Sequence, residues 1–252
     1  MSCPVPEKRT NRPTTYLADL RDHLTQENRL WGLLSCAEKA RADRYRVPLK
    51  RTTFILGRGI LRDLLGRWLR RDPASLAFSE NPHGKPLLSG DTGSSAGNLH
   101  FNLSHSGHYL LIGICEGREL GVDLQEMHPQ DHPEVVSRKV FSPQENRALA
   151  GLKDQAYRDR FYQFWVWKEA YLKGLGAGFH ISPQEINLLP EPAGPARPWE
   201  TSVVSPEGVR WSIRDLPAPP GYRAAAAAPG FPAELPVKNL APQPASFRGC
   251  GQ

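Results

Sequence analysis

The chain has 252 residues, enough for one large domain or two small ones, and 39% of them are hydrophobic. Its formal net charge of +6 would suit an acidic partner such as nucleic acid, a phosphate-rich ligand or an acidic protein, but the lysines and arginines are scattered without a long basic run, which favours a mildly basic surface. The four cysteines form no CxxC pair, the N-terminus lacks an apolar signal segment, and no stretch is apolar enough to span a bilayer. We therefore expect a cytoplasmic protein with free thiols and no membrane contact.

The first half of the chain predicts one long helix followed by strands. We expect residues 1–15 to form a flexible lead. Residues 51–69 carry apolar side chains at helical spacing, and Pro73 ends that pattern. The shorter expected elements are a capped helix at 35–46, a turn at 81–84, and strands at 75–78, 99–103, 109–115 and 120–125. The last two strands are separated by a short turn and predict a hairpin.

The second half repeats this order. A long helix is expected at 155–175, ended by Gly176, and Pro183 precedes a short expected strand at 185–189. The remaining expected elements are helices at 134–141 and 143–151 and a strand pair formed by 209–213 and 222–228.

The repeated order of helix, proline and short strand predicts an α+β fold. We expect a pseudo-twofold pair of similar halves, each a long helix packed on a small, mostly antiparallel sheet. The N-terminal half is placed at 16–125 and the C-terminal half at 126–228. Residues 229–252 are rich in proline and alanine and are expected to be a disordered tail.

Asp123 is the first candidate functional residue. It lies between Val122 and Leu124 in a short apolar strand, where side chains alternate between two faces. A buried carboxylate is costly unless it is paired or binds a metal. An edge residue that faces water is the alternative, but the apolar flanks favour a functional role.

Glu169 is the second candidate. It lies in a strongly aromatic helix and shares a helix face with Lys173, four residues later. Taken alone, the two residues fit an ordinary surface ion pair.

Two further segments could present groups to phosphate. Residues 102–108 form a small polar segment with two histidines at the end of a strand, and Gly84-Lys85-Pro86 forms a rigid turn that carries one cation. Taken alone, each segment also fits a plain solvated turn.

Together these features resemble the 4′-phosphopantetheinyl transferase superfamily, in its larger monomeric, surfactin-synthetase-activating branch. That family shows an arginine at the first long helix, then G-K-P, N-x-S-H-S, G-[IV]-D-x-E and W-x-x-K-E-A with a later lysine. The matching positions here are Arg51, Gly84-Lys85-Pro86, Asn102–Ser106, Gly121–Gln125, and Trp165–Ala170 with Lys173. The resemblance covers residues 35–228, and the shared order and spacing make it specific.

The resemblance implies transfer of the 4′-phosphopantetheine group of coenzyme A to a serine of an apo acyl or peptidyl carrier protein, with release of 3′,5′-ADP. It implies Mg²⁺ held by Asp123, Glu169 and Gln125, and a catalytic set of Glu169, Asp123 and Lys173. The residues implied to bind coenzyme A are Arg51, Lys85, Pro86, Ser104, His105 and Lys173. It further implies a monomer with two pseudo-dimeric halves.

One departure from the family pattern leaves alternatives open. The family has an acidic residue two positions after the aspartate, whereas this chain has Gln125, whose amide could ligate Mg²⁺ directly or leave the position to water. A degenerate relative that binds coenzyme A or a carrier without transfer is therefore a second hypothesis. Nucleic-acid binding is a third, but Trp165 and Trp167 lie in an amphipathic helix, which favours core packing over base stacking.

Overall fold

The computed structural model describes residues 13–89, 98–128, 133–176, 181–190, 200–231 and 235–243. Its helices are α1 (Glu27–Leu33), α2 (Cys36–Asp43), α3 (Pro48–Leu69), α4 (Pro133–Val140), α5 (Pro143–Leu149) and α6 (Asp154–Leu175), with short 3-10 helices at Leu20–Gln26, Pro73–Ser75 and Pro183–Glu185. Its strands are β1 (Thr14–Asp19), β2 (Ala77–Glu80), β3 (Pro86–Ser89), β4 (Leu99–Ser106), β5 (Tyr109–Glu116), β6 (Gly121–Glu126), β7 (Glu200–Val204), β8 (Arg210–Leu216), β9 (Tyr222–Pro229) and β10 (Val237–Asn239).

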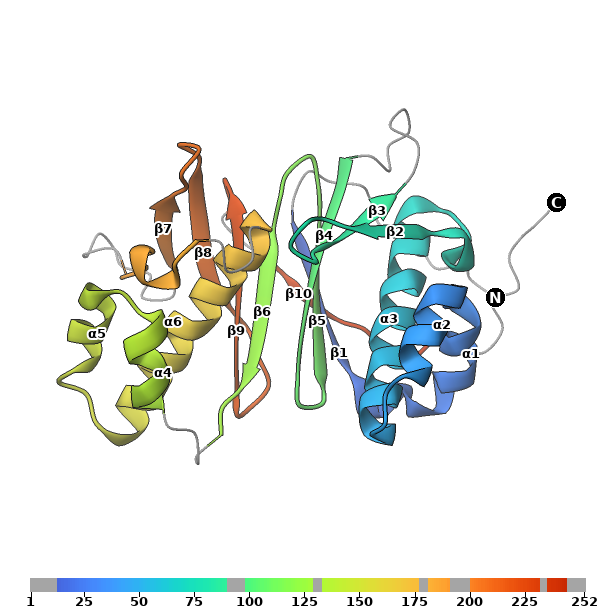
Figure 1. Cartoon of the computed structure of the whole chain (residues 1–252), viewed down its shortest axis with the longest axis horizontal. Coiled ribbons are helices and arrows are strands. Elements are labelled where there is room, and N and C mark those ends of the chain that lie inside the picture. Colours follow the sequence, from blue (N-terminus) through green and yellow to red (C-terminus); the bar gives the residue numbers. More distant parts are fainter. Residues whose placement is uncertain are drawn as a thin grey trace.

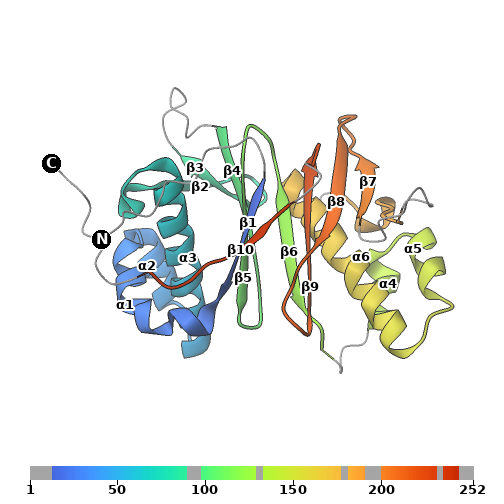
Figure 2. The same ribbon diagram turned by 180° about the vertical axis from the view of Figure 1, so that it is seen from behind.

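These elements form four layers, with two sheets at the centre and helices on both outer sides (Figure 1, Figure 2). The first sheet has the order β10-β1-β5-β4 and is covered by α1–α3. The second has the order β6-β9-β8-β7 and is covered by α4–α6. The expected α+β fold of two similar halves is therefore confirmed. None of the helices in the described ranges is long and apolar enough to cross a membrane.

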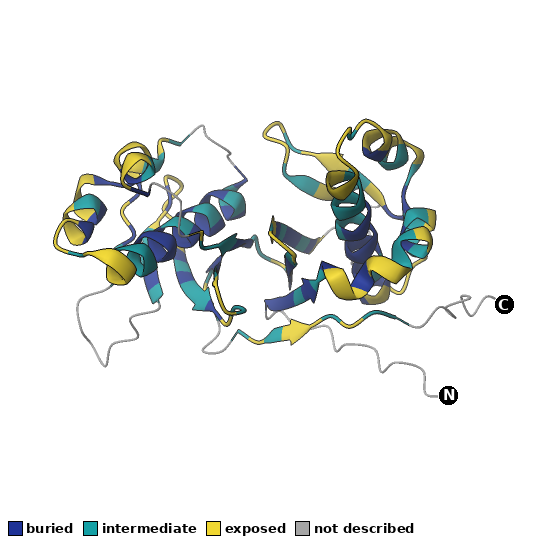
Figure 3. Cartoon of the chain, turned by 90° about the horizontal axis from the view of Figure 1, so that it is seen from below, coloured by how far each residue is buried: buried dark blue, intermediate teal, exposed yellow. Residues whose placement is uncertain are grey.

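Each half has its own core beneath a helix of 22 residues. In the first half, α3 packs Leu61 and Leu65 against Phe101 and Ile112 of the sheet. In the second half, the aromatic side of α6 packs against Trp211 and Ile213 of β8, among other residues. Figure 3 shows the buried faces of both long helices turned toward the sheets. The helical spacing of apolar residues therefore encodes which face of each helix is buried.

The two halves share a buried ion pair of the same design. In the first half, Arg62 of α3 donates to Glu38 at 2.7 Å and to the carbonyl groups of Pro73 and Leu76, both at 2.9 Å. Glu38 is also the N3 residue of a capping box whose N-cap is Ser35. The Arg62 side chain of α3 thus connects α2 to the 3-10 turn Pro73–Ser75, which follows α3 in the chain.

In the second half, Lys168 takes the place of Arg62. Its Nζ lies 2.8 Å from Glu145, and it donates to the carbonyl groups of Pro183 at 2.8 Å and Ile186 at 2.5 Å. Glu145 closes a capping box with Ser142, as Glu38 does with Ser35. The repetition of this whole arrangement agrees with the similarity of the two halves that the order of elements predicts.

The halves meet where the two sheets pack on each other. Leu111 of β5 packs against Val122 and Leu124 of β6. At one edge, Asn102 Oδ1 accepts a hydrogen bond from the backbone N–H of Val122 at 3.0 Å, and Ser106 Oγ accepts one from Glu126 N–H at 2.9 Å. Side chains of β4 thus replace the backbone partner that the edge strand β6 lacks on this side.

The predicted boundary between the halves and the predicted hairpin both need correction. Residues 120–125 were expected to pair with 109–115 and to close the first half at residue 125, but β6 pairs antiparallel with β9 in the second sheet. The segment 117–120 therefore carries the chain from one half to the other, and β5 instead forms its hairpin with β4. The apolar faces of β6 fit either sheet, so the local pattern does not determine the partner.

The expected flexible termini are also corrected within the described residues. Thr14 and Thr15, assigned to the flexible lead, are buried in β1. In the assigned tail, β10 pairs parallel with β1, and Thr15 Oγ1 donates to the Pro236 carbonyl at 2.8 Å. Residues 1–12, 232–234 and 244–252 lie outside the described part of the chain.

Residues 185–189, expected as a strand, form no strand ladder. The segment begins in the 3-10 turn Pro183–Glu185 and continues in irregular backbone. Its polar backbone groups bind side chains instead, because Leu188 N–H donates to Glu145 Oε1 at 2.9 Å and the Ile186 carbonyl accepts from Lys168. The long helix α6 and the capped helix α5 thus supply the partners that a neighbouring strand would have supplied.

Candidate functional site

Close packing of β6 on α6 brings the first candidates together. A Cβ atom added to Gly121 would collide with the backbone of Ala170 and Gly174, so only glycine at this position lets the strand approach the helix so closely. Asp123, two residues along the same face of β6, then lies beside the last turns of α6. The G-V-D motif therefore positions its carboxylate through its glycine.

Asp123 is 3% exposed and is paired through one oxygen only. Its Oδ1 accepts hydrogen bonds from Lys173 Nζ at 2.5 Å and from Ser104 Oγ at 2.8 Å. Lys173 also donates to Ser104 Oγ at 2.9 Å, so the three side chains form a closed triangle. Asp123 Oδ2 is buried and has no hydrogen-bond partner among the described residues. Such an orphaned oxygen is costly unless a further positive group completes its shell.

Glu169 lies close enough to Asp123 for the two carboxylates to repel each other. Burial and then the Asp123 charge raise the pKa of Glu169, with Lys173 opposing. Burial likewise raises the pKa of Asp123, and the charge and hydrogen bond of Lys173 oppose that shift. The buried Asp123 carboxylate and the half-buried Glu169 carboxylate face one ammonium, so when both are ionised they leave a local excess of negative charge, which attracts a further cation.

A cavity of about 250 Å³ opens beside this cluster, between the two halves. Its wall is formed by residues 83–86 of the β2–β3 turn, residues 102 and 103 of β4, and Glu169, Leu172, Lys173 and Gly176 of α6. Lys85 and Pro86, predicted to contact coenzyme A, are therefore in the same cavity as Glu169 and Lys173. The ammonium of Lys85 is already paired, with Glu119 at 2.5 Å and the Gly174 carbonyl at 2.8 Å.

The other predicted residues form no hydrogen bond or ion pair with the side chains of Asp123, Glu169 or Lys173 in the described part of the chain. Arg51 lies in the first turn of α3, where it pairs with Asp43 at 3.1 Å and stacks over Trp31. His105 follows Ser104 on β4 and is exposed as a residue, although neighbouring atoms desolvate its ring enough to lower its pKa. The amide of Gln125 donates to the Glu126 carbonyl at 3.2 Å. Their predicted roles stay predictions.

Three residues of the site region were given no role of their own in the sequence analysis. Asn102 and Ser106 lie in the predicted segment 102–108 and join β4 to β6, and strand alternation could have indicated this, because they share one face of β4 with Ser104. Glu119 pairs with Lys85, 34 residues away in the sequence. No local pattern in the sequence points to Glu119, because that contact forms only when the halves come together.

Comparison with known proteins agrees with this arrangement. Residues 25–116 match the family model described as "4′-phosphopantetheinyl transferase, N-terminal", and residues 119–225 match the "4′-phosphopantetheinyl transferase superfamily". The junction between these matches falls at the 117–120 crossover between the two sheets.

Curated relatives match most of the chain. The 4′-phosphopantetheinyl transferase HetI of Nostoc is 36% identical over 80% of this chain and 81% of its own. The 4′-phosphopantetheinyl transferase ffp of Bacillus subtilis is 28% identical, over 84% and 91% of the two chains. Sfp of Bacillus subtilis strain 168 is 25% identical, over 79% and 83%. The chain therefore belongs to the 4′-phosphopantetheinyl transferase superfamily, with Sfp-like enzymes as its relatives.

Proposed function

We propose that this enzyme transfers the 4′-phosphopantetheine group of coenzyme A to a serine of an apo acyl or peptidyl carrier protein and releases 3′,5′-ADP. It acts in the cytoplasm as a monomer and requires Mg²⁺. The observation that carries the proposal is the buried, half-paired Asp123 beside Glu169 and Lys173, two residues that line a cavity between the halves.

The residues present suit Mg²⁺. This ion binds oxygen ligands, uses one or two carboxylates, and completes its shell with waters and substrate phosphates. Asp123 Oδ2 and the Glu169 carboxylate would supply two such ligands, with Gln125 as a third candidate through its amide oxygen. No group of three or more His, Cys, Asp or Glu side chains that could hold a metal ion occurs in the described ranges, and in this proposal oxygens of coenzyme A and water complete the coordination of Mg²⁺. When bound, Mg²⁺ would neutralise charge on the pyrophosphate of coenzyme A.

Side chains of the protein would bind the pyrophosphate and accept the proton of the attacking serine. Lys173 places an ammonium next to Asp123, where it can hold the pyrophosphate. Glu169 accepts the proton of the attacking serine hydroxyl. A bond forms between the serine oxygen and the β-phosphorus, and the bond from that phosphorus to the 3′,5′-ADP oxygen breaks. Catalysis of this kind rests on positioning and charge neutralisation.

The cavity wall and its surroundings would bind the rest of coenzyme A. Lys85 and Pro86 form part of the wall, and Arg51, Ser104 and His105 are proposed to approach the phosphates. Arg51 would exchange its exposed pairings, with Asp43 at 3.1 Å and with Glu27 at 3.6 Å, for a phosphate contact, and exposed ion pairs of this kind are weak.

Product analysis separates this enzyme from a binder that has lost transfer. Purified protein, coenzyme A, Mg²⁺ and an apo carrier are incubated, and 3′,5′-ADP is quantified by chromatography. We expect one 3′,5′-ADP for each carrier modified, and none when EDTA is present. Binding of coenzyme A without any 3′,5′-ADP, across several carrier types, would show that the chain only binds.

A further inference from the structure

The β2–β3 turn (residues 81–85) is fixed to the end of α6 by side chains that cross between the halves. Lys85 Nζ donates to the Gly174 carbonyl, and Asn81 Nδ2 donates to the Gly176 carbonyl, both at 2.8 Å. Asn81 Oδ1 also accepts hydrogen bonds from the backbone N–H groups of His83 and Lys85, both at 2.9 Å. The same helix carries Glu169 and Lys173, so these contacts set the distance between opposite walls of the cavity.

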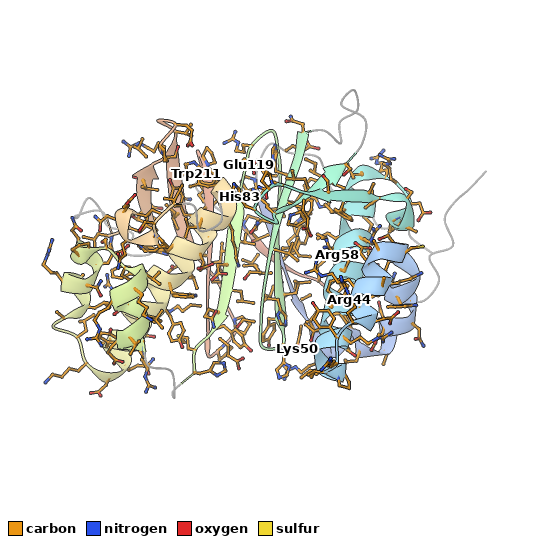
Figure 4. The ribbon with its side chains drawn as sticks, in the orientation of Figure 1. Arg44, Lys50, Arg58, His83, Glu119 and Trp211 are labelled. Atoms are coloured by element: carbon orange, nitrogen blue, oxygen red, sulfur yellow. The ribbon has the colours of Figure 1, made fainter. Side chains whose placement is uncertain are left out.

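Glu119 supplies the charge that this arrangement needs. The Lys85 side chain is 8% exposed, and a cation withdrawn from water requires a compensating anion. Glu119 Oε2 lies 2.5 Å from Lys85 Nζ, and Glu119 Oε1 lies 3.1 Å from His100 Nδ1 on β4. Glu119 itself lies in the 117–120 crossover, and Figure 4 places it at the same end of the molecule as His83. One carboxylate in the crossover therefore contacts both the β2–β3 turn and β4.

This pairing limits what Lys85 can offer a ligand. Its ammonium is bound to Glu119 and to a backbone carbonyl, while the residue still lines the cavity. Its methylene groups, not its charge, are thus available to the cavity. A lysine that bound phosphate directly would have to leave Glu119 first.

We infer that Glu119 is a positioning residue for coenzyme A binding, acting through Lys85 by holding the β2–β3 turn against α6. This inference rests on the proposed function. The two possible roles of Lys85 predict opposite changes in the KM for coenzyme A when Glu119 is removed. If Glu119 positions the turn, its removal raises the KM for coenzyme A. If Glu119 only restrains a phosphate-binding ammonium, its removal frees that ammonium and lowers the KM.

Steady-state kinetics with coenzyme A as the varied substrate test this. We expect Glu119→Gln to raise the KM for coenzyme A about tenfold and to leave kcat within about twofold of the wild type. A tenfold change lies within the range of interaction energies between residues of one ion-pair network. Glu134→Gln removes the same charge from an exposed position on α4 and should change neither constant. In a Lys85→Met background, Glu119→Gln should have no further effect, because its action passes through Lys85.

Hydrogen exchange on the ligand-free proteins provides a second measurement that needs no transfer. The amides of residues 77–89 should exchange faster in Glu119→Gln than in the wild type, and those of α4 and α5 should be unchanged. An unchanged or lowered KM, independent effects in the double variant, or unchanged exchange in residues 77–89 would overturn the inference. If the wild type modified no carrier, the proposed function would fail, and the exchange comparison would still decide whether Glu119 fixes the turn.

Discussion

At the residue scale, Asp123 departs from the rule that buried carboxylates are fully paired. Ser104 and Lys173 share Oδ1, and Oδ2 is left buried without a partner among the described residues. Folding bears the cost of such a group, and ligand binding can recover it. Strand alternation in an apolar segment was sufficient to single out Asp123 as a carboxylate in an apolar strand and as a candidate functional residue. It could not predict the triangle with Ser104 and Lys173, because those residues come from two other elements.

Replacing Asp123 tests its role without changing side-chain volume. Asp123→Asn should lower the transfer rate by about 10²–10³-fold, the usual loss when a preorganised electrostatic group is removed. The rate is measured by following mass gain of the carrier over time, and a melting curve checks folding.

Asp215→Asn is the matched control for Asp123→Asn. Asp215 is a half-buried carboxylate, and both residues pair across the sheet with Ala225. Its partners include Trp167, Gln163 and Arg223, all outside the cavity lining. We expect Asp215→Asn to keep transfer within a few-fold of the wild type. A folded Asp123→Asn enzyme with a rate near that of Asp215→Asn would contradict the assignment.

At the element scale, the two long helices are each fixed by a buried cation and a capping-box glutamate. The sequence predicts the capping boxes and the helices, since both depend on residues close together in the chain. It does not reveal that Lys168 in the W-x-x-K-E-A motif is structural while its neighbour Glu169 faces the cavity. That distinction depends on which face of α6 meets the segment 183–188, which forms no strand.

Removal of the Lys168 charge should therefore destabilise the protein directly. Lys168→Met leaves Glu145 as a buried carboxylate without its cation, a change that costs about 3–5 kcal/mol. Urea unfolding measures the loss. The double variant Lys168→Met with Glu145→Gln should lose less than the sum of the single variants, because it also removes the unpaired charge. Strict additivity would show that the two residues do not interact.

The Glu119 contacts predict a pH dependence of stability. Burial alone would raise the pKa of Glu119, but the hydrogen bonds from His100 and Lys85 outweigh it and lower that pKa to about 2. In the unfolded chain the pKa of a glutamate is about 4.3, so the stabilisation is complete above that pH and is lost as pH falls toward 2. The difference in unfolding free energy between wild type and Glu119→Gln should thus shrink from pH 5 to pH 3. A difference that grows on acidification would contradict this pairing.

At the scale of the whole molecule, the C-terminal segment joins the halves behind the sheets. After β9 of the second half, the chain returns to pair β10 with β1 of the first, as Figure 2 shows. Farther along, the Gln243 carbonyl accepts a hydrogen bond from Gln26 at 2.7 Å. Composition predicted disorder here, because proline and alanine are common in tails. It could not predict the pairing, which uses backbone groups and so has little sequence signature.

Truncation tests this connection. Ending the chain after Phe231 removes β10 and should lower the melting temperature by at least about 5 °C. In a chain of this size, a loss of about 1 kcal/mol in the free energy of unfolding lowers the melting temperature by about 2–4 °C. Ending it after Gln243 keeps every described contact of the segment and serves as the control. Equal melting temperatures for the two truncated proteins would show that the connection contributes nothing.

The measurement that tests the central claim most directly is the intact mass of an apo carrier protein after incubation with the enzyme, coenzyme A and Mg²⁺. A carrier whose acceptor serine is replaced by alanine, and a reaction with EDTA, serve as controls. We predict a gain of one phosphopantetheine on the native carrier and no gain in either control. An unchanged mass for all carrier classes, or an equal gain on the alanine carrier, would contradict transfer to serine by this enzyme.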